Sequence, residues 1–407
     1  MPKKMTKKNQ TKTNGGQLLF FLIMGIVGAA CGILIIRSIR GGVSADIPLK
    51  QKIVKIVVLF ILFYIAYILH VILHEAGHLV FGLLSGYKFC AFRIFNLMWV
   101  RNKEGIRFKR MSIAGTGGQC LMSPPGLVDG KMPVLLYNFG GAIMNLIVAA
   151  IAGGLVFVCP AGSVIRAFML FLVILGVVLA LLNGLPLRMG AANNDGRNAM
   201  DLMKDPEACR AFWIQMKMNE LASRGIRVKD MPREWFTVPG KEAMQNGIIA
   251  PMAVMVSGRL MDQQRFAEAD ELMKRLLEEE NGIVGVYRGL LGNDRIYVEL
   301  IGENRPEALE ALKTPEQLRI MRALKNYLSV LRTEYAYALL AKKDEENAKK
   351  ILRVFEKSAR TYPYPGEVEA ERELIAIAQN KVVVEEVDDT EDKDVSSVSE
   401  DAPVSGK

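Results

Sequence analysis

Two histidines and a glutamate lie close together in the segment HEAGH at residues 74–78. On a helix, His74 and His78 are one turn apart on the same face, so both imidazoles can bind one zinc ion at about 2.0–2.1 Å. Glu75 follows the first histidine and can take a proton from a water on that ion. This His-Glu-x-x-His pattern is typical of zinc hydrolases. The segment therefore predicts a site for one Zn²⁺ ion with Glu75 as the general base.

The apolar surroundings of this segment favour a functional role. HEAGH lies in an apolar run, 53–84, which is longer than the roughly 20 residues that cross a bilayer. Ionisable side chains in such runs are costly and usually functional, which disfavours the alternative of polar groups on a buried helix face. His70 is the only other histidine in the chain. It could line the cavity, support a ligand, touch substrate or simply bond within a helix bundle.

A catalytic zinc site needs a third protein ligand and an open position for water. Between residues 53 and 196 the acidic residues are Glu75, Glu104, Asp129 and Asp195. Glu104 falls in an expected hairpin turn and Asp129 in a glycine-rich loop. Asp195 follows the last apolar run, on the side of the membrane to which the histidines are delivered, and we predict it as the third ligand. The structural alternative for NNDG is a turn or a helix N-cap.

Four apolar runs are long enough to span a bilayer, and they lie at roughly 18–36, 53–84, 134–159 and 165–183. The formal net charge is +9, and many lysines and arginines flank these runs. Because such residues collect on the cytoplasmic side, we predict a multi-pass protein of the cell membrane with both termini in the cytoplasm. The same placement disfavours a nucleic-acid partner. An uncleaved anchor is favoured over a signal peptide at the N-terminus.

The predicted fold class is an α-helical membrane protein with about four transmembrane helices and a membrane-associated β-hairpin, followed by a cytoplasmic all-α domain. The hairpin is expected at 88–113, with its break at 101–105, while the glycine- and proline-rich 115–126 is expected to be irregular. Amphipathic helices at 265–279 and 333–355 favour either tetratricopeptide-like repeats or an ordinary helical domain. The expected segments are a basic cytoplasmic tail (1–17), a first anchor and linker (18–52), the zinc core (53–200), the helical domain (201–380) and an acidic disordered tail (381–407).

The third apolar run contains GGAIMN at 140–145. Small residues such as Gly140 and Gly141 allow close helix packing. Asn145 can bond across helices, which is a structural role, or can contact the reaction centre.

Three of these motifs together resemble the site-2 protease family of intramembrane zinc metalloproteases. They are HEAGH, GGAIMN and NGLP…NDG (183–196), and the resemblance covers residues 53–200, about a third of the chain. It implies cleavage of a substrate's transmembrane segment near the cytoplasmic face. It also implies that His74, His78 and Asp195 bind zinc and that Glu75 activates the water.

The resemblance extends to the substrate. Asn183 and Pro186 match the family's Asn-x-x-Pro element, which is thought to hold the substrate backbone, and we group Asn145 with them as a substrate contact. Strands at 88–113 would bind extended substrate by adding a strand. The segment between Pro186 and Asp195 is longer than in the usual pattern.

Three functions compete at this stage. The first is a zinc metalloendopeptidase acting on a membrane-anchored protein or peptide, with a cytoplasmic protein partner for its helical domain. The second is a non-catalytic membrane adaptor that uses the helical domain to bind partners. The third, a transporter or metal channel, is disfavoured because the apolar runs show no internal repeat.

Overall fold

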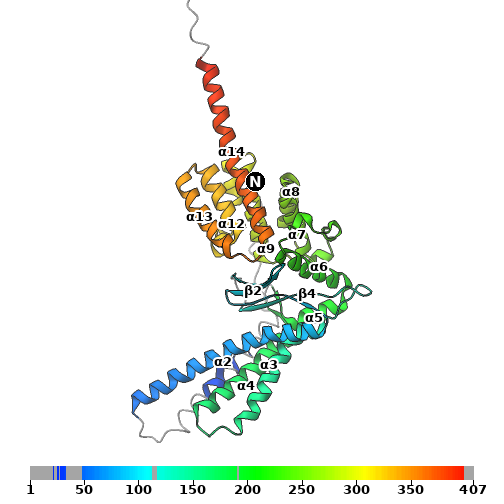
Figure 1. Ribbon diagram of the computed structural model, residues 1–407, viewed down its shortest axis with the longest axis vertical. Helices are drawn as coiled ribbons and strands as arrows, with labels where there is room; N and C mark the ends of the chain where they lie inside the picture. The colour runs from blue at the N-terminus through cyan, green and yellow to red at the C-terminus, as the bar shows by residue number, and fades with distance from the viewer. Residues whose placement is uncertain are drawn as a thin grey trace, which may run out of the picture. The chain divides into compact units, whose positions relative to one another are not determined.

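The computed structural model describes residues 22, 25–26, 28–33, 48–111, 117–189 and 192–397, which are mostly helical (Figure 1). The chain divides into two compact units. Unit 1 comprises Met1–Phe95 and Ile113–Trp213, and unit 2 comprises Asn96–Ser112 and Ile214–Lys407. The residues of HEAGH and the other motifs at 140–145 and 183–196 all belong to unit 1.

Three long helices make up most of unit 1: α2 (Leu49–Leu84), α3 (Leu135–Val156) and α4 (Val164–Gly184). They pack side by side (Figure 1), and each is long and apolar enough to cross a membrane. Their outer faces expose large apolar side chains, since Phe60, Ile151 and Ile165 are 60%, 61% and 62% exposed. Such faces suit lipid rather than water.

These helices coincide with the apolar runs predicted at 53–84, 134–159 and 165–183. The predicted run at 18–36 lies mostly outside the described residues. Three of the four predicted spans are therefore present as apolar helices.

Glycines bring α2 and α3 together. A Cβ atom on Gly77 would overlap the carbonyl of Gly140, and a Cβ on Gly140 would overlap the backbone of Gly77. Only residues without a side chain permit this approach. The helix that carries HEAGH is therefore held directly against the helix that carries GGAIMN.

Two strands of unit 1 pair with each other. Strand β1 (Lys88–Ile94) pairs antiparallel with β4 (Gly118–Ser123), with Phe92 opposite Cys120. The sequence predicts an irregular segment at 115–126. This prediction is wrong over 118–123, which form strand β4. The physical reason is that pairing with β1 satisfies the backbone of a segment whose composition is otherwise typical of turns.

The longer segment after Pro186 forms a small hairpin. Strands β5 (Arg188–Met189) and β6 (Ala192–Asn193) pair antiparallel, with Arg188 opposite Asn193. Helix α5 (Asp195–Lys204) begins immediately afterwards, and α6 (Pro206–Ser223) follows it. A hairpin brings its two ends together, so the extra residues do not carry Asp195 away from the end of α4.

Unit 2 contains the expected hairpin. Strands β2 (Leu97–Asn102) and β3 (Gly105–Arg110) pair antiparallel, and Asn102 lies opposite Gly105. Two residues connect the strands, and Gly105 has φ of 115°, which favours glycine. This confirms a β-hairpin over 97–110, whereas residues 88–94 of the predicted range 88–113 form strand β1.

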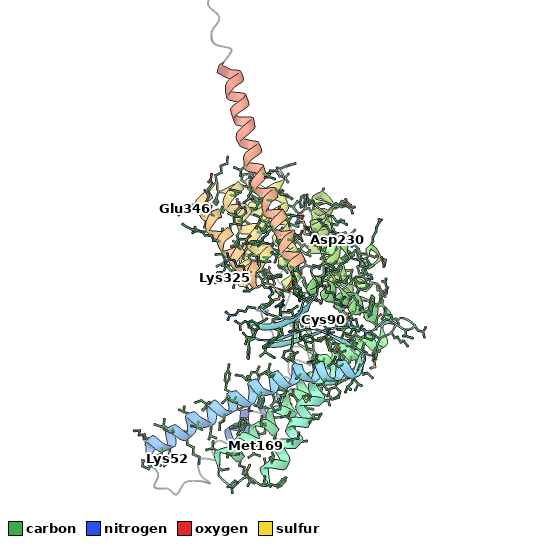
Figure 2. All side chains as sticks on the ribbon, in the orientation of Figure 1. Lys52, Cys90, Met169, Asp230, Lys325 and Glu346 are labelled. Carbon is green, nitrogen blue, oxygen red and sulfur yellow. The ribbon has the colours of Figure 1, made fainter. Side chains whose placement is uncertain are left out.

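The rest of unit 2 is a helical bundle around one hydrophobic core. Its helices are α7 (Pro251–Asp262), α8 (Phe266–Glu278), α9 (Gly285–Ile301), α10 (Pro306–Leu312), α11 (Pro315–Ala323), α12 (Leu328–Ala336), α13 (Glu345–Thr361) and α14 (Pro365–Ser397). Short 3-10 turns occur at Val228–Asp230, Arg233–Trp235 and Ala243–Gln245, and a π-helical turn at Tyr337–Ala341. Charged side chains such as Lys325 and Glu346 point away from the core (Figure 2).

One of the two helical predictions needs different bounds. Helix α8 matches 265–279, whereas 333–355 is not one helix, because Lys343 has φ of 51° and separates the π-helical turn from α13.

The predicted disordered tail begins at Lys381, yet α14 continues to Ser397. Adding residues to an established helix requires no new nucleation, which favours this extension. A tetratricopeptide-like arrangement stays a prediction.

Candidate metal centre

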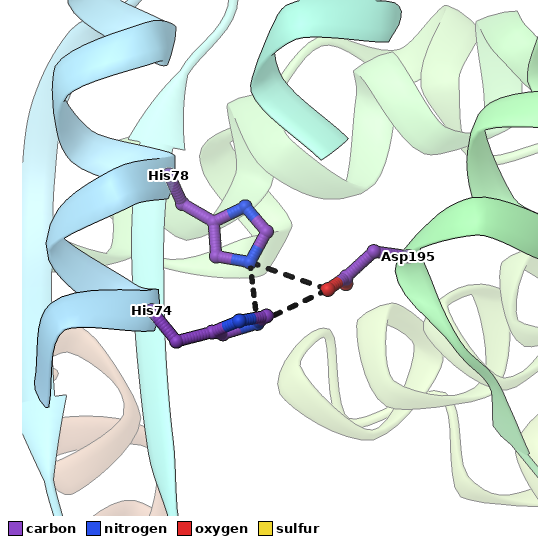
Figure 3. Close-up of side chains that lie close together, drawn as sticks. All are labelled: His74, His78 and Asp195. Carbon is purple, nitrogen blue, oxygen red and sulfur yellow. Dashed lines mark hydrogen bonds and ion pairs between the residues drawn. The ribbon is translucent and has the colours of Figure 1, made fainter. Parts of the chain in front are cut away.

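Three side chains converge in unit 1 as potential metal ligands: His74 and His78 from α2, and Asp195 from the first turn of α5 (Figure 3). The Asp195 Oδ2 atom lies 3.2 Å from His74 Nε2 and 3.4 Å from His78 Nε2. The two Nε2 atoms lie 3.1 Å apart. The structure thus brings together the three residues that the sequence proposed as metal ligands, across more than a hundred residues of chain.

These separations suit a small tetrahedral ion. Ligand atoms that bind such an ion at about 2.0–2.1 Å lie about 3.3 Å from one another. The three separations of 3.1, 3.2 and 3.4 Å fall on both sides of this value. The three protein atoms therefore have the spacing of three corners of a tetrahedron, as in zinc sites that keep one position for water or substrate.

The outward-facing ring nitrogen of His78 has a partner that fixes its tautomer. His78 Nδ1 lies 2.7 Å from the backbone carbonyl oxygen of Tyr137 on α3. A carbonyl only accepts hydrogen bonds, so Nδ1 carries the hydrogen and Nε2 keeps its lone pair in the neutral ring. This is the arrangement in which a histidine binds a metal.

Asn145 connects the other ligand to His70. The Asn145 side-chain amide lies 3.3 Å from His74 Nδ1 and 3.0 Å from His70 Nδ1, and His70 Nε2 lies 2.8 Å from the carbonyl oxygen of Leu172 on α4. Both Asn145 and His70 are 0% exposed.

The direction of these bonds follows from the last partner in the chain. His70 Nε2 must donate to the Leu172 carbonyl, so in a neutral ring His70 Nδ1 accepts and must face the NH₂ group of Asn145. The structure places the Asn145 oxygen beside His70 and its NH₂ group beside His74, and a half-turn of the amide, whose two ends have the same shape, exchanges them so that the oxygen faces His74. His74 Nδ1 then donates to it and Nε2 keeps its lone pair, as in His78. Of the roles open for His70, the structure favours support of a metal ligand.

Asp195 is placed by its neighbour Asn194. The Asn194 side-chain oxygen accepts from the backbone N–H of Arg197 and caps α5, and it also accepts from Leu187 N–H. Its NH₂ group donates to the carbonyl oxygens of Leu182 and Leu185 at the end of α4. The N-cap alternative for NNDG is thus realised by Asn194, which ties the start of α5 to α4 and leaves Asp195 free to face the histidines.

Gly196 allows this close approach, because a Cβ atom there would overlap the carbonyl of Gly184. Burial by itself would raise the pKa of Asp195, but the neighbouring imidazoles of His74 and His78 lower this pKa well below the usual range. The carboxyl is therefore ionised at neutral pH, as a metal ligand must be.

Glu75 faces the β strands of unit 1. A Cβ atom on Gly118, the first residue of β4, would lie 2.7 Å from Glu75 Oε1. Arg93 of β1 donates to the Gly118 carbonyl at 3.2 Å and is 1% exposed. The sequence patterns treated the lysines and arginines between the apolar runs as flanking charges and gave Arg93 no role in the site. The available signal was its place amid the apolar residues of FCAFRIF, where a strand buries one side chain in two.

The predicted substrate contacts have different surroundings in the structure. Asn145 lies beside the metal ligand His74, whereas the Asn183 amide donates to the carbonyl oxygen of Leu179 in its own helix, at 2.9 Å. Pro186 is exposed just beyond the end of α4. Substrate contact by these three residues stays a prediction.

No protein-family model, curated protein or solved structure matches this chain. The case for a function therefore rests on the geometry of the site and on the apolar helices that carry it.

Proposed function

We propose that this protein is an intramembrane zinc metalloprotease, which hydrolyses peptide bonds in or near the transmembrane segment of a membrane-anchored substrate. One observation carries the proposal. His74, His78 and Asp195 bring three potential metal ligands to tetrahedral spacing, on and beside a helix that is long and apolar enough to span a membrane. Ionisable groups at such a place are costly unless they function.

The proposed chemistry uses one zinc ion held by His74, His78 and Asp195. A bound zinc ion lowers the pKa of a coordinated water to about 7 and polarises a carbonyl group. Glu75, next to His74 in sequence, takes a proton from the attacking water and later gives it to the leaving amine. Asn145 and the Tyr137 carbonyl hold the two imidazoles in the ligating tautomer.

We propose that strand β4 binds the substrate backbone. It pairs with β1 along one edge, and in the described part of the sheet no strand pairs with its other edge. Its first residue, Gly118, lies against the Glu75 side chain. An extended substrate that adds to this edge would place its peptide bonds beside the general base. The proposed substrate-binding strand is therefore at residues 118–123 and not within the range 88–113 that the sequence suggested.

In the proposed arrangement, the apolar helices lie in the cell membrane and both termini lie in the cytoplasm. Unit 2 would then be cytoplasmic, where it could recruit a protein partner. A second candidate function, a non-catalytic membrane adaptor, relies on unit 2 alone. It does not account for a ligand set of tetrahedral spacing with an adjacent glutamate.

The test compares cells that make the wild-type protein with cells that make Glu75→Gln, by quantitative mass spectrometry of their membrane fractions. The proposal expects at least one single-span protein to accumulate uncut only with Glu75→Gln. Glu104→Gln is the matched control, because Glu104 is exposed in the β2–β3 turn. Zinc content of the purified variants is measured in parallel, and Glu75→Gln should retain it.

Two results would remove the proposal. One is an identical set of cut products from wild type and Glu75→Gln. The other is zinc content that stays the same when His74, His78 and Asp195 are all replaced, since the ligand set would then not bind the ion. If deletion of unit 2 gives a phenotype while Glu75→Gln gives none, the adaptor function is favoured.

A further inference from the structure

A cavity of about 320 Å³ lies within unit 2, bounded by α6, α7, α9, α12 and α14. This volume is in the range of small-molecule sites, about 300–1,000 Å³. Part of its wall is apolar and formed by the methionines at 218, 231, 255 and 261. Methionine side chains adapt to ligands of different shape.

Acidic side chains outnumber basic ones in the cavity wall. Four carboxyl groups and two guanidinium groups line it: Asp262, Asp294, Glu367 and Glu371, and Arg227 and Arg332. Each arginine is already engaged with acids, since Arg227 pairs with Asp262 and Glu373, and Arg332 with Asp294 and Glu371. Two guanidinium groups do not balance four ionised carboxylates, and burial accordingly raises the pKa of both Glu367 and Glu371.

Two polar atoms of the cavity wall lack hydrogen-bond partners. The Arg332 side chain is 1% exposed, and its Nη1 atom has no hydrogen-bond acceptor. The Glu371 Oε2 atom lies 3.3 Å from Arg332 Nε but accepts no hydrogen bond. A buried donor and a buried acceptor without partners are rare in folded proteins and require an explanation. A ligand that offers an acceptor to one and a donor to the other would satisfy both.

A glycine keeps this cavity open. Gly258 lies inside helix α7 and lines the cavity, and a Cβ atom at this position would meet nothing within 4 Å. Glycine within a helix costs about 0.5–1 kcal/mol relative to alanine. Gly258 is exposed and no neighbouring atom requires glycine here, so its effect is to leave the cavity open on the solvent side.

We propose that this cavity binds a basic amino-acid residue, either free or within a polypeptide. Its cationic nitrogen would donate to Glu371 and Glu367, its carbonyl or carboxylate oxygen would accept from Arg332, and its alkyl chain would lie along the methionine wall. This occupant supplies the missing positive charge, the missing acceptor and the missing donor at once.

The state of Glu371 agrees with this occupant. Burial raises the pKa of Glu371 to about 7, Arg332 opposes the rise, and Asp294, Glu367 and Asp262 add to it. A ligand cation would favour the ionised carboxylate and so lower this pKa. Binding should therefore release a proton near neutral pH, which calorimetry in buffers of different ionisation enthalpy detects.

The experiment uses the full chain in detergent micelles and three probes: free L-lysine, N-acetyl-lysine N-methylamide and N-acetyl-norleucine N-methylamide. Affinities are measured by saturation-transfer NMR and by calorimetry. The norleucine probe has the same backbone and a similar chain but no cation. Both lysine probes should bind at least about tenfold more tightly than norleucine, and Glu371→Gln should weaken them by about tenfold or more.

Two further variants separate binding from folding. Gly258→Leu should fill the cavity and abolish binding while it preserves the helix, as circular dichroism would show. Glu346→Gln is the matched control, because Glu346 projects into solvent from α13 (Figure 2). Tighter binding of free lysine would assign a free amino acid, and tighter binding of the capped probe would assign a residue within a polypeptide.

Three results would overturn the proposal. They are no saturable binding of either lysine probe, equal binding of norleucine, and unchanged lysine binding in both Glu371→Gln and Gly258→Leu. The first would leave a water-filled cavity whose ion pairs only join helices. Because none of these measurements involves the metal centre, the outcome is independent of the proposed proteolysis.

Discussion

The hydrogen-bonded chain from Leu172 through His70 and Asn145 to His74 predicts that zinc affinity depends on side chains that do not touch the ion. In Asn145→Leu, His74 Nδ1 loses its acceptor at 3.3 Å while the size of the side chain is kept. The ring can then rotate or adopt the tautomer that places hydrogen on Nε2, which cannot bind metal.

The size of this effect follows from the number of bonds lost. Removing the partner of one metal-binding histidine typically costs 10–100-fold in metal affinity, or about 1.4–2.7 kcal/mol. We expect Asn145→Leu in this range. His70→Phe keeps the hydrogen bond between Asn145 and His74 but removes the 3.0 Å hydrogen bond between His70 and Asn145, which orients the amide. We therefore expect a smaller loss of zinc affinity, below about tenfold.

Asn138→Leu provides the matched control. Asn138 is also a buried asparagine of α3, but its amide donates to the Val134 carbonyl of its own helix at 2.7 Å. Zinc affinity of each purified variant is measured by competition with a chromophoric chelator. Because the chain has only three histidines, ¹⁵N labelling of their rings reports each tautomer directly. Equal affinity in Asn145→Leu and Asn138→Leu, or a larger loss in His70→Phe than in Asn145→Leu, would refute the direction assigned to this chain.

Three other changes test the site and unit 2. Asp195→Asn should lower zinc content, because it removes the negative ligand and leaves two neutral ones; full zinc content by atomic absorption would mean another third ligand. Gly141→Ala should also reduce zinc content, because its Cβ would lie 2.5 Å from His74 Nδ1 and Nε2 and displace the ring, and an unchanged content would contradict this packing. In unit 2, the pKa of Glu371 is raised from 4.5 to about 7, so the stability that its neutral form provides is lost as pH rises through 7. The free energy of unfolding of Glu371→Gln, relative to that of the wild type, should therefore increase by about 1–3 kcal/mol between pH 5 and 8. Thermal unfolding that shows no such pH-dependent difference would argue against a buried Glu371.

The local sequence predicts most of the long helices and one β-hairpin of this protein. Apolar runs of membrane length specify α2, α3 and α4 because every backbone group in such a run must be satisfied within its own segment. The hairpin of β2 and β3 could also be predicted from sequence, because alternating residues flank a two-residue connection. Strand β4 could not be predicted in this way, because its residues become a strand only through pairing with β1, which lies more than twenty residues earlier.

Sequence alone determined the ligand types and their local order. His74, Glu75 and His78 share one helix, where a spacing of four residues fixes one face, and Asp195 was the acid that remained near the correct membrane side. That choice relied on elimination, because nothing local states how far a side chain lies from one that is more than a hundred residues away.

Only the tertiary structure decided how these residues meet and what supports them. Packing of Gly77 against Gly140 sets the spacing of α2 and α3, and the cap by Asn194 fixes where α5 begins. The connection from His70 to His74 through Asn145 joins two helices and could not be deduced from residue spacing. The cavity of unit 2 likewise exists only in the assembled bundle, because its buried charges come from helices far apart in sequence. Sequence specifies contacts within an element, whereas contacts between elements depend on how all of them pack together.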